Sequence, residues 1–347
     1  ADAGAITVVA PTLTLDGGRI SVDTQGPGTG GSVTVEADRV VLRNEGQIFA
    51  GTGGSGHGGD IAIRAGSLEI TGIGDAPSAT PGQGDPATGL FSNVQDHGSG
   101  QGGAIRVTAG SIALSDNGRI SVRTRGSGPA GSIALAVGGV LRMKGGTVEA
   151  AVDEAGPMAA RPTSRTTGGS VTIAAETLEL DDGSTIQSRS LRGPGRAGDI
   201  RLDIRDGLLM RRSAVTTETR EGDGGNIRMQ VGRLLDLDRA AVTTSVGGGA
   251  GRGGNIDIDP PFVVLDRGRI EANAFGGPGG NIRIAAGRLV TSAEGAVIQA
   301  SSARSVDGTV EIAAPEIDIG STLVVLPDVF LKAGDLLPDN CAGRGDW

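Results

Sequence analysis

The chain has few of the residues on which several protein classes depend. Among its 347 residues there is one cysteine, Cys341, so no internal disulfide can form. There is no tyrosine, one tryptophan and five phenylalanines, which argues against a sugar-processing groove, because such grooves use aromatic platforms. No apolar run reaches the roughly 18 residues that a membrane-spanning helix requires. The chain is therefore neither a disulfide-stapled domain nor a helical membrane protein.

Positive charge is also in short supply. The formal net charge is −9 and the isoelectric point is near 4.9. A nucleic-acid or anionic-membrane partner requires a basic face, so we expect no nucleic-acid binding and no membrane insertion. The two histidines, His57 and His97, lie in glycine-rich stretches without partners for a metal or nucleophilic site. We expect no cofactor and no metal.

Glycine is abundant, with 63 residues, and much of it recurs in one phrase. The phrase reads Gly-Gly-x-Ile-x-Ile-x-Ala, then Leu-x-Leu, a glycine turn, and Ile-x-Ala or Val-x-Thr. The second glycine of each pair usually recurs every 26 to 29 residues, with longer intervals of 44 after Gly59 and 38 after Gly131. A repeat of this length is typical of a solenoid, in which similar coils stack around one continuous core.

Within each repeat the apolar residues alternate, so the elements are strands rather than helices. Ile282 and Ile284, for example, point to one side, and Asn281 and Arg283 to the other. Three short strands per coil, each stacked on its equivalent in the next coil, predict an all-β, right-handed parallel β-helix of about eleven coils over residues 1–320. We call the residue after each glycine pair the follower. Followers are predicted to form a structural polar ladder, at Ser32, Asp60, Ser132, Ser170, Asp199, Asn226, Asn255 and Asn281.

Three segments interrupt the repeat. Residues 72–101 and 151–167 are rich in glycine, proline and polar residues, which predicts loops extruded from a coil corner. Residues 321–347 lack the glycine pair, and we expect them to form a carboxy-terminal cap and tail. Because coil positions are structural, binding is assigned to the loops, with candidate residues Asp85, Phe91, His97, Arg161 and Arg165.

The repeat phrase resembles the repeats of filamentous-haemagglutinin-like exoproteins of two-partner secretion systems. A closing pattern strengthens the resemblance, formed by Leu326, Pro327, Phe330, Leu331, Leu336, Leu337 and Cys341. The resemblance implies a β-helix exported through a dedicated outer-membrane pore of a Gram-negative cell, then secreted or held at the surface as an adhesin with an unnamed host or matrix receptor. The family's amino-terminal secretion domain is not recognisable, so we expect the chain to be the distal part of a longer exoprotein.

Two other functions remain open. A polysaccharide-active β-helix enzyme would need acidic residues clustered on one sheet face, usually beside a basic residue or a metal. The pairs Asp181-Asp182 and Asp257/Asp259 have no acidic matches in both neighbouring coils, so we interpret them as solvated carboxylates. A structural spacer is the second alternative. The tripeptide Arg344-Gly345-Asp346 matches a short integrin-binding motif and is too short to decide the function. We predict a non-enzymatic exoprotein or adhesin segment.

Overall fold

The computed structural model describes residues 2–73, 87–95, 98–153 and 166–313. Every regular element among these residues is a β-strand, with no helix that could cross a membrane. The chain divides into two units, Ala1–Glu316 and Ile317–Trp347. The described residues all belong to the first, and the predicted cap over 321–347 lies outside them.

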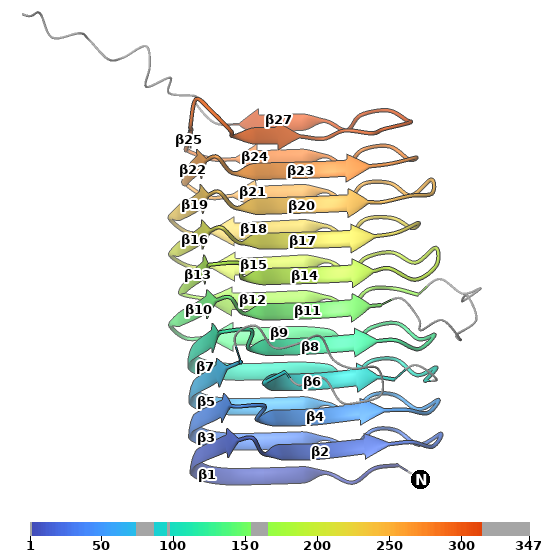
Figure 1. The fold of residues 1–347 in the computed structure, drawn as a ribbon. Helices are drawn as coiled ribbons and strands as arrows, with labels where there is room; N and C mark the ends of the chain where they lie inside the picture. The colour runs from blue at the N-terminus through green and yellow to red at the C-terminus, as the bar shows by residue number, and fades with distance from the viewer. Residues whose placement is uncertain (1, 74–86, 96–97, 154–165, 314–347) are drawn as a thin grey trace, which may run out of the picture. The chain divides into compact units, whose positions relative to one another are not determined.

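The first unit is a right-handed parallel β-helix, as the repeat predicted (Figure 1). Its described residues contain ten complete coils, and one further strand opens an eleventh. Each coil contributes to three parallel ladders. The first ladder consists of β1 (Ile6–Asp16), β3 (Val33–Arg43), β5 (Ile61–Thr71), β7 (Ala104–Ser115), β9 (Ser132–Val137), β12 (Val171–Ala175), β15 (Ile200–Ile204), β18 (Ile227–Val231), β21 (Ile256–Asp259), β24 (Ile282–Ala285) and β27 (Val310–Ala313).

The second ladder is short because in the first four coils its residues belong to the long strands β1, β3, β5 and β7, which run on through the corner. Beginning with β9, the coil breaks into two strands there. The second ladder then consists of β10 (Val140–Lys144), β13 (Thr177–Asp181), β16 (Gly207–Arg211), β19 (Leu234–Asp238), β22 (Phe262–Asp266) and β25 (Arg288–Thr291). The first and second ladders together form one 17-stranded sheet, where the sequence had predicted two separate sheets.

The third ladder forms a separate 10-stranded sheet, called here the third sheet. It consists of β2 (Arg19–Thr24), β4 (Gln47–Thr52), β6 (Gly89–Val94), β8 (Arg119–Thr124), β11 (Thr147–Val152), β14 (Thr185–Ser190), β17 (Ala214–Thr219), β20 (Ala241–Val246), β23 (Arg269–Ala274) and β26 (Val297–Gln299).

Strand β6 corrects the prediction that residues 72–101 form one loop. Gly89–Val94 pairs with both β4 and β8, with Leu90 aligned on Ile48 and Ile120. Only residues 74–86 and 96–97 of that segment lie outside the described residues. The predicted loop over 151–167 also begins inside a strand, because Ala151 and Val152 end β11. Both strands bury apolar side chains in the coil interior, and this burial outweighs the polar composition around them.

The core is a set of aliphatic columns that run from coil to coil. Ile61, Ile105 and Ile133 are aligned in successive coils and are at most 1% exposed. Hydroxyls inside the core tie the third sheet to the glycine corner. The Oγ of Ser188 donates to the carbonyl oxygen of Gly169 at 2.8 Å, and Thr244 Oγ1 donates to that of Gly254 at 2.8 Å. These two buried hydroxyls are thereby satisfied.

The second glycine of each pair is required by the stacking itself. A Cβ on Gly131 would lie 1.7 Å from the carbonyl oxygen of Gly103, and one on Gly254 would lie 1.8 Å from that of Gly225. Such contacts with backbone atoms cannot be relieved by a rotamer change. The first position is less strict, since Ala130 and Ala197 occupy it in two coils. The glycine pair therefore specifies the corner, as predicted.

Candidate functional site

The outward face of the third sheet changes character along the stack. One residue per coil points outward at equivalent positions, and we call this series the outer column. In chain order it is Ser21, Phe49, Phe91, Ser121, Glu149, Gln187, Thr216, Thr243, Glu271 and Gln299. Its four members from β4, β6, β8 and β11 are buried, whereas the others are half-buried or exposed. These four residues, called here the buried stretch, are thus the part of the column that differs from the exposed pattern of the other coils.

Glu149 occupies the centre of a charged cluster on this stretch. Its neighbours in the column, Ser121 and Gln187, donate to its two carboxylate oxygens at 3.0 and 2.9 Å. The guanidinium groups of Arg123 and Arg189, from β8 and β14, approach the same carboxylate to 3.6 and 3.2 Å. Glu149 is only 4% exposed, so these contacts form largely away from water.

Asp153 completes the cluster, which we call the ion network (Arg123, Glu149, Asp153 and Arg189). Arg123 donates to Asp153 with its Nη2 at 2.6 Å, and Arg189 approaches Asp153 to 3.5 Å. Both arginines reach across Ala151, which lies between them in the register and has a side chain too small to obstruct them. Two arginines and two carboxylates therefore alternate across three strands, with no net charge.

The electrostatics of Glu149 limit its chemistry. Burial raises the pKa of its carboxyl, but the charges of Arg123 and Arg189 and the Ser121 hydroxyl together hold that pKa below its ordinary value. A general acid or base at neutral pH needs a raised pKa and an oxygen free for the substrate. Glu149 is ionised and both of its oxygens are already bonded, so the arrangement favours a rigid, ordered surface over proton transfer.

Next to the ion network, the outer column carries two phenylalanines. Phe49 and Phe91 are paired in register and are 9% and 2% exposed. Arg19 lies over the Phe49 ring at 4.3 Å from its centroid, within cation–π range. Phe49, Phe91 and Ala87 form a small apolar cluster separate from the main core.

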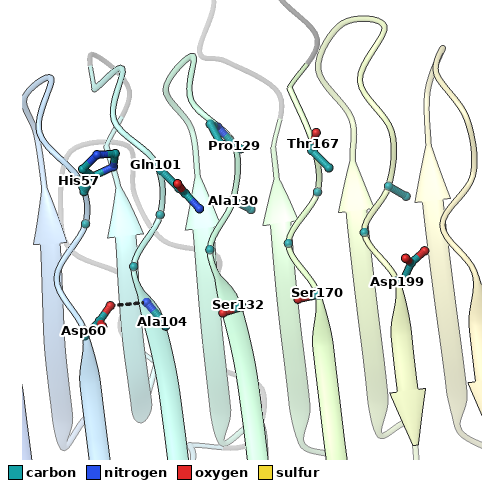
Figure 2. A pocket seen from close by; sticks show the side chains of 18 of the residues that line it. His57, Asp60, Gln101, Ala104, Pro129, Ala130, Ser132, Thr167, Ser170 and Asp199 are labelled. Carbon is teal, nitrogen blue, oxygen red and sulfur yellow. Dashed lines mark hydrogen bonds between the residues drawn. The ribbon is translucent and has the colours of Figure 1, made fainter.

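A second surface, the corner groove, lies along the glycine-pair corner. It crosses five coils, has a volume of about 610 Å³, and contains followers and the residues before each glycine pair. Figure 2 shows the followers Asp60, Ala104, Ser132, Ser170 and Asp199 in one row, with His57, Gln101, Pro129 and Thr167 in a second. The lining is polar, with Arg106 and Arg196 as its cations.

The predicted polar ladder is present at this corner but incomplete. Side-chain oxygens of Asn226, Asn255 and Asn281 each accept the backbone N–H of the next follower, at 3.0, 2.9 and 3.0 Å. Asp60 and Asp199 do the same for Ala104 and Asn226, at 2.7 and 2.8 Å. The prediction is confirmed for these five followers. Ser32, Ser132 and Ser170 make no such bond among the described residues, because a serine side chain is too short to reach the next coil.

Most of the residues predicted to bind a partner fall where no structure is described. Asp85, His97, Arg161 and Arg165 lie outside the described residues. Phe91 is described, and it points outward from β6 into the buried apolar cluster with Phe49 and Ala87. Of the five residues the structure places only Phe91, and their binding role stays a prediction.

One member of each acidic pair considered as a catalytic candidate has basic partners. Asp182 pairs with Arg212, and Asp257 lies between Arg228 and Arg283 in the register, 3.3 Å from the latter. Hydrogen bonding to Arg212 lowers the pKa of Asp182. Within the described ranges, no group of three or more histidine, cysteine, aspartate or glutamate side chains is placed to hold a metal ion.

The ion network was missed from the sequence, although a signal for it was present. Aligning the third-strand phrases GRISVRT, GTVEAAV and STIQSRS places a glutamate between a serine and a glutamine, and an alanine between two arginines. A charged residue facing small and basic residues in both neighbouring coils indicates an ion cluster. Asp153 carries no such signal because it lies beyond the strand.

Comparison with known proteins gives no relative for this chain. No protein-family model, no curated protein and no solved structure matches it.

Proposed function

We propose that this chain is a non-enzymatic, rigid segment of a secreted or surface-exposed exoprotein, and that it attaches to a partner through the buried stretch of the outer column and its surroundings. One observation carries the proposal. Two connections are longer than the equivalent connections of the neighbouring coils, the one from β5 to β6 and the one from β11 to β12, and we call them the two departures. Both departures border the third sheet where its outer column is buried. Solenoids commonly place insertions on a binding face.

The ion network supports this proposal by fixing the face between the two departures. Glu149 is buried and both of its carboxylate oxygens are bonded, which holds the surrounding side chains in one arrangement, so the partner meets a surface that is already ordered. A preorganised surface loses less conformational entropy on binding. The parallel stack supplies the same rigidity along the whole segment, because each coil packs on the next.

Export and localisation are proposed on the resemblance alone. The repeat phrase and the closing pattern from Leu326 to Cys341 resemble exoproteins that use a dedicated outer-membrane pore. We expect the full-length protein to reach the cell surface only when a matching pore is co-expressed. Surface labelling of cells with and without the pore tests this expectation.

The attachment proposal is tested by replacing residues 74–86 and 154–165, separately and together, with short glycine–serine links. Beads coated with each protein are scored for attachment to host cells and to extracellular matrix. The double replacement should lose attachment, while the control Thr216→Ala with Thr243→Ala, in the same column, should retain it. Unchanged attachment after the double replacement would contradict the proposal.

The two other functions predict different results. A spacer would attach nothing itself, so coated beads would not bind at all, and shortening the stack would impair only the full-length protein. A polysaccharide-active enzyme would release new reducing ends or unsaturated products from acidic glycans. The bonded, low-pKa carboxylate of Glu149 argues against the second outcome.

A further inference from the structure

In the part of the chain that the structure describes, the interrupted ladder leaves the backbone N–H of Asp60 and two further backbone donors without an acceptor in the corner groove. Among the described residues, the N–H groups of Ser170 and Asp199 donate to no acceptor, although they are equivalent to groups bonded by asparagines further along the stack. The followers one coil earlier are Ser132 and Ser170, whose side chains are too short to reach. Strong donors that the protein leaves unused on a groove wall are available to a ligand.

Among the described residues, the surroundings of these two amides are polar and contain no phenylalanine, tyrosine or tryptophan. The side chains of Thr167 and Ser170 are exposed, and the groove also contains the half-exposed Ser132. Arg196 lies at the rim, 2.6 Å from the carboxylate of Asp199, and Arg106 lies 3.0 Å from that of Asp60, so both carboxylates of the groove are ion-paired. The unused backbone amides favour a ligand rich in oxygen acceptors.

We propose that the corner groove binds a linear acidic glycan, a chain of uronic-acid sugars, along the stack axis. Its carboxylate and hydroxyl oxygens accept from the Ser170 and Asp199 N–H groups and from the serine and threonine hydroxyls. Arg106 and Arg196 lie beside the same wall, but each is ion-paired with a carboxylate of the groove, so the backbone amides carry the recognition. Hydrogen bonds to a charged acceptor are about twice as strong as neutral ones, which suits donors on an open wall.

The spacing of the donors selects against a peptide. Equivalent groups in successive coils are about 4.8 Å apart, and the rings of a linear pyranose chain recur at close to that distance. Carbonyls on one side of an extended peptide recur at about 6.7 Å, twice the rise per residue. A neutral glycan would lack the charged acceptor, and the groove has no aromatic platform on which its rings could stack.

The test is an amide NMR titration of the whole chain with a hexamer of galacturonic acid at low salt. The Ser170 and Asp199 resonances should shift, and the Asn255 resonance should not. A neutral glucose hexamer and a hexaglutamate peptide, at the same concentration, should leave all three in place. Binding should weaken as salt is raised, because the attraction is partly electrostatic.

A variant separates loss of binding from loss of folding. Ser132→Asn together with Ser170→Asn places a side-chain acceptor opposite each free amide, as Asn226 does for Asn255. This variant should bind the galacturonate hexamer at least tenfold more weakly while unfolding at the same or higher temperature. The control Asn255→Ser, outside the groove, should bind as the unaltered chain does.

Three results would overturn the proposal: no shift with the galacturonate hexamer, an equal shift with the peptide or the neutral sugar, or full affinity in the double variant. The inference does not depend on the attachment proposal, because it rests on the corner groove and not on the outer column of the third sheet. Cleavage of the hexamer would contradict the non-enzymatic function and leave the binding site intact.

Discussion

The coils up to Asp199 and those from Ile200 onward share one backbone register but differ in what they carry outward. In the later coils, asparagine followers close the corner ladder, and the outer column is half-buried or exposed. In the earlier coils, serine followers leave the ladder open at several steps although Asp60 closes one, four consecutive outer-column residues are buried, and charged groups bond across strands. The later coils show what the repeat needs in order to stack. The features that only the earlier coils carry are not needed for stacking, and they are therefore the candidates for function.

The largest difference is expected at Glu149 and Glu271, which occupy the same column in the two regions. Glu149→Gln should destabilise the chain by about 2–3 kcal/mol, because it removes the buried charge between the two arginines of the ion network and leaves Asp153 as their only carboxylate there. Glu271→Gln should cost about 1 kcal/mol or less, since its partner Arg269 is 59% exposed. Urea unfolding of both variants measures the difference. Equal costs would mean that the ion network is not a distinct feature.

Glu149 also predicts that the stability of the chain depends on pH. The folded pKa of Glu149 lies below its ordinary value of 4.5, so its contribution to stability is present above the unfolded pKa. That contribution is lost as the pH falls through the folded pKa. Glu149→Gln should therefore flatten the acid side of the stability profile. An acid limb identical to that of the unaltered chain would contradict this assignment.

The glycine corner should behave alike in both regions. Gly131→Ala and Gly254→Ala each place a Cβ within 2 Å of a backbone oxygen of the preceding coil, and overpacking of this kind costs about 1–3 kcal/mol. Thermal unfolding should show similar losses for the two variants. A tolerated alanine at either position would show that the stack can relax, and that the glycine is not required by sterics there.

The polar ladder should distinguish the regions by a smaller amount. Asn255→Ala removes the acceptor for the Asn281 N–H and should cost about 1 kcal/mol, the usual net value of one hydrogen bond. Ser170→Ala removes no ladder bond and should be nearly neutral. If the two variants lose the same stability, serine and asparagine followers are equivalent.

The smallest effect is a gain. Ser170→Asn supplies an acceptor for the Asp199 N–H and should stabilise the chain by about 0.5 kcal/mol. Differential scanning calorimetry should detect a slightly higher melting temperature. Asn226→Ser is the reciprocal change and should lower it. A loss of stability in Ser170→Asn would mean that the groove wall cannot take the longer side chain.

The sequence predicted the features that repeat. Alternating isoleucines such as Ile282 and Ile284 specify the interior, and the glycine pair specifies the corner, because every coil must satisfy the same packing. Phrase spacing could not show that β1, β3, β5 and β7 continue through the next corner. That depends on how neighbouring backbones pair there, which the apolar pattern does not encode.

The site was predicted less well, for two reasons. Composition suggested a loop over 72–101, and the strand around Leu90 was lost in it because one short phrase gives little signal. Glu149 looks like an ordinary surface residue until its neighbours in β8 and β14 are aligned beside it. The contacts that make up the site join residues about one repeat length apart in the sequence. They can be recognised only when the register between neighbouring coils is known.

Hydrogen exchange at the follower amides tests the central difference between the two regions most directly. Residue-resolved exchange should show the Asn255 and Asn281 N–H groups protected by the ladder, and those of Ser170 and Asp199 exchanging rapidly. Equal protection at all four positions would contradict the account, since the ladder would then be continuous and the corner groove would hold no free donors.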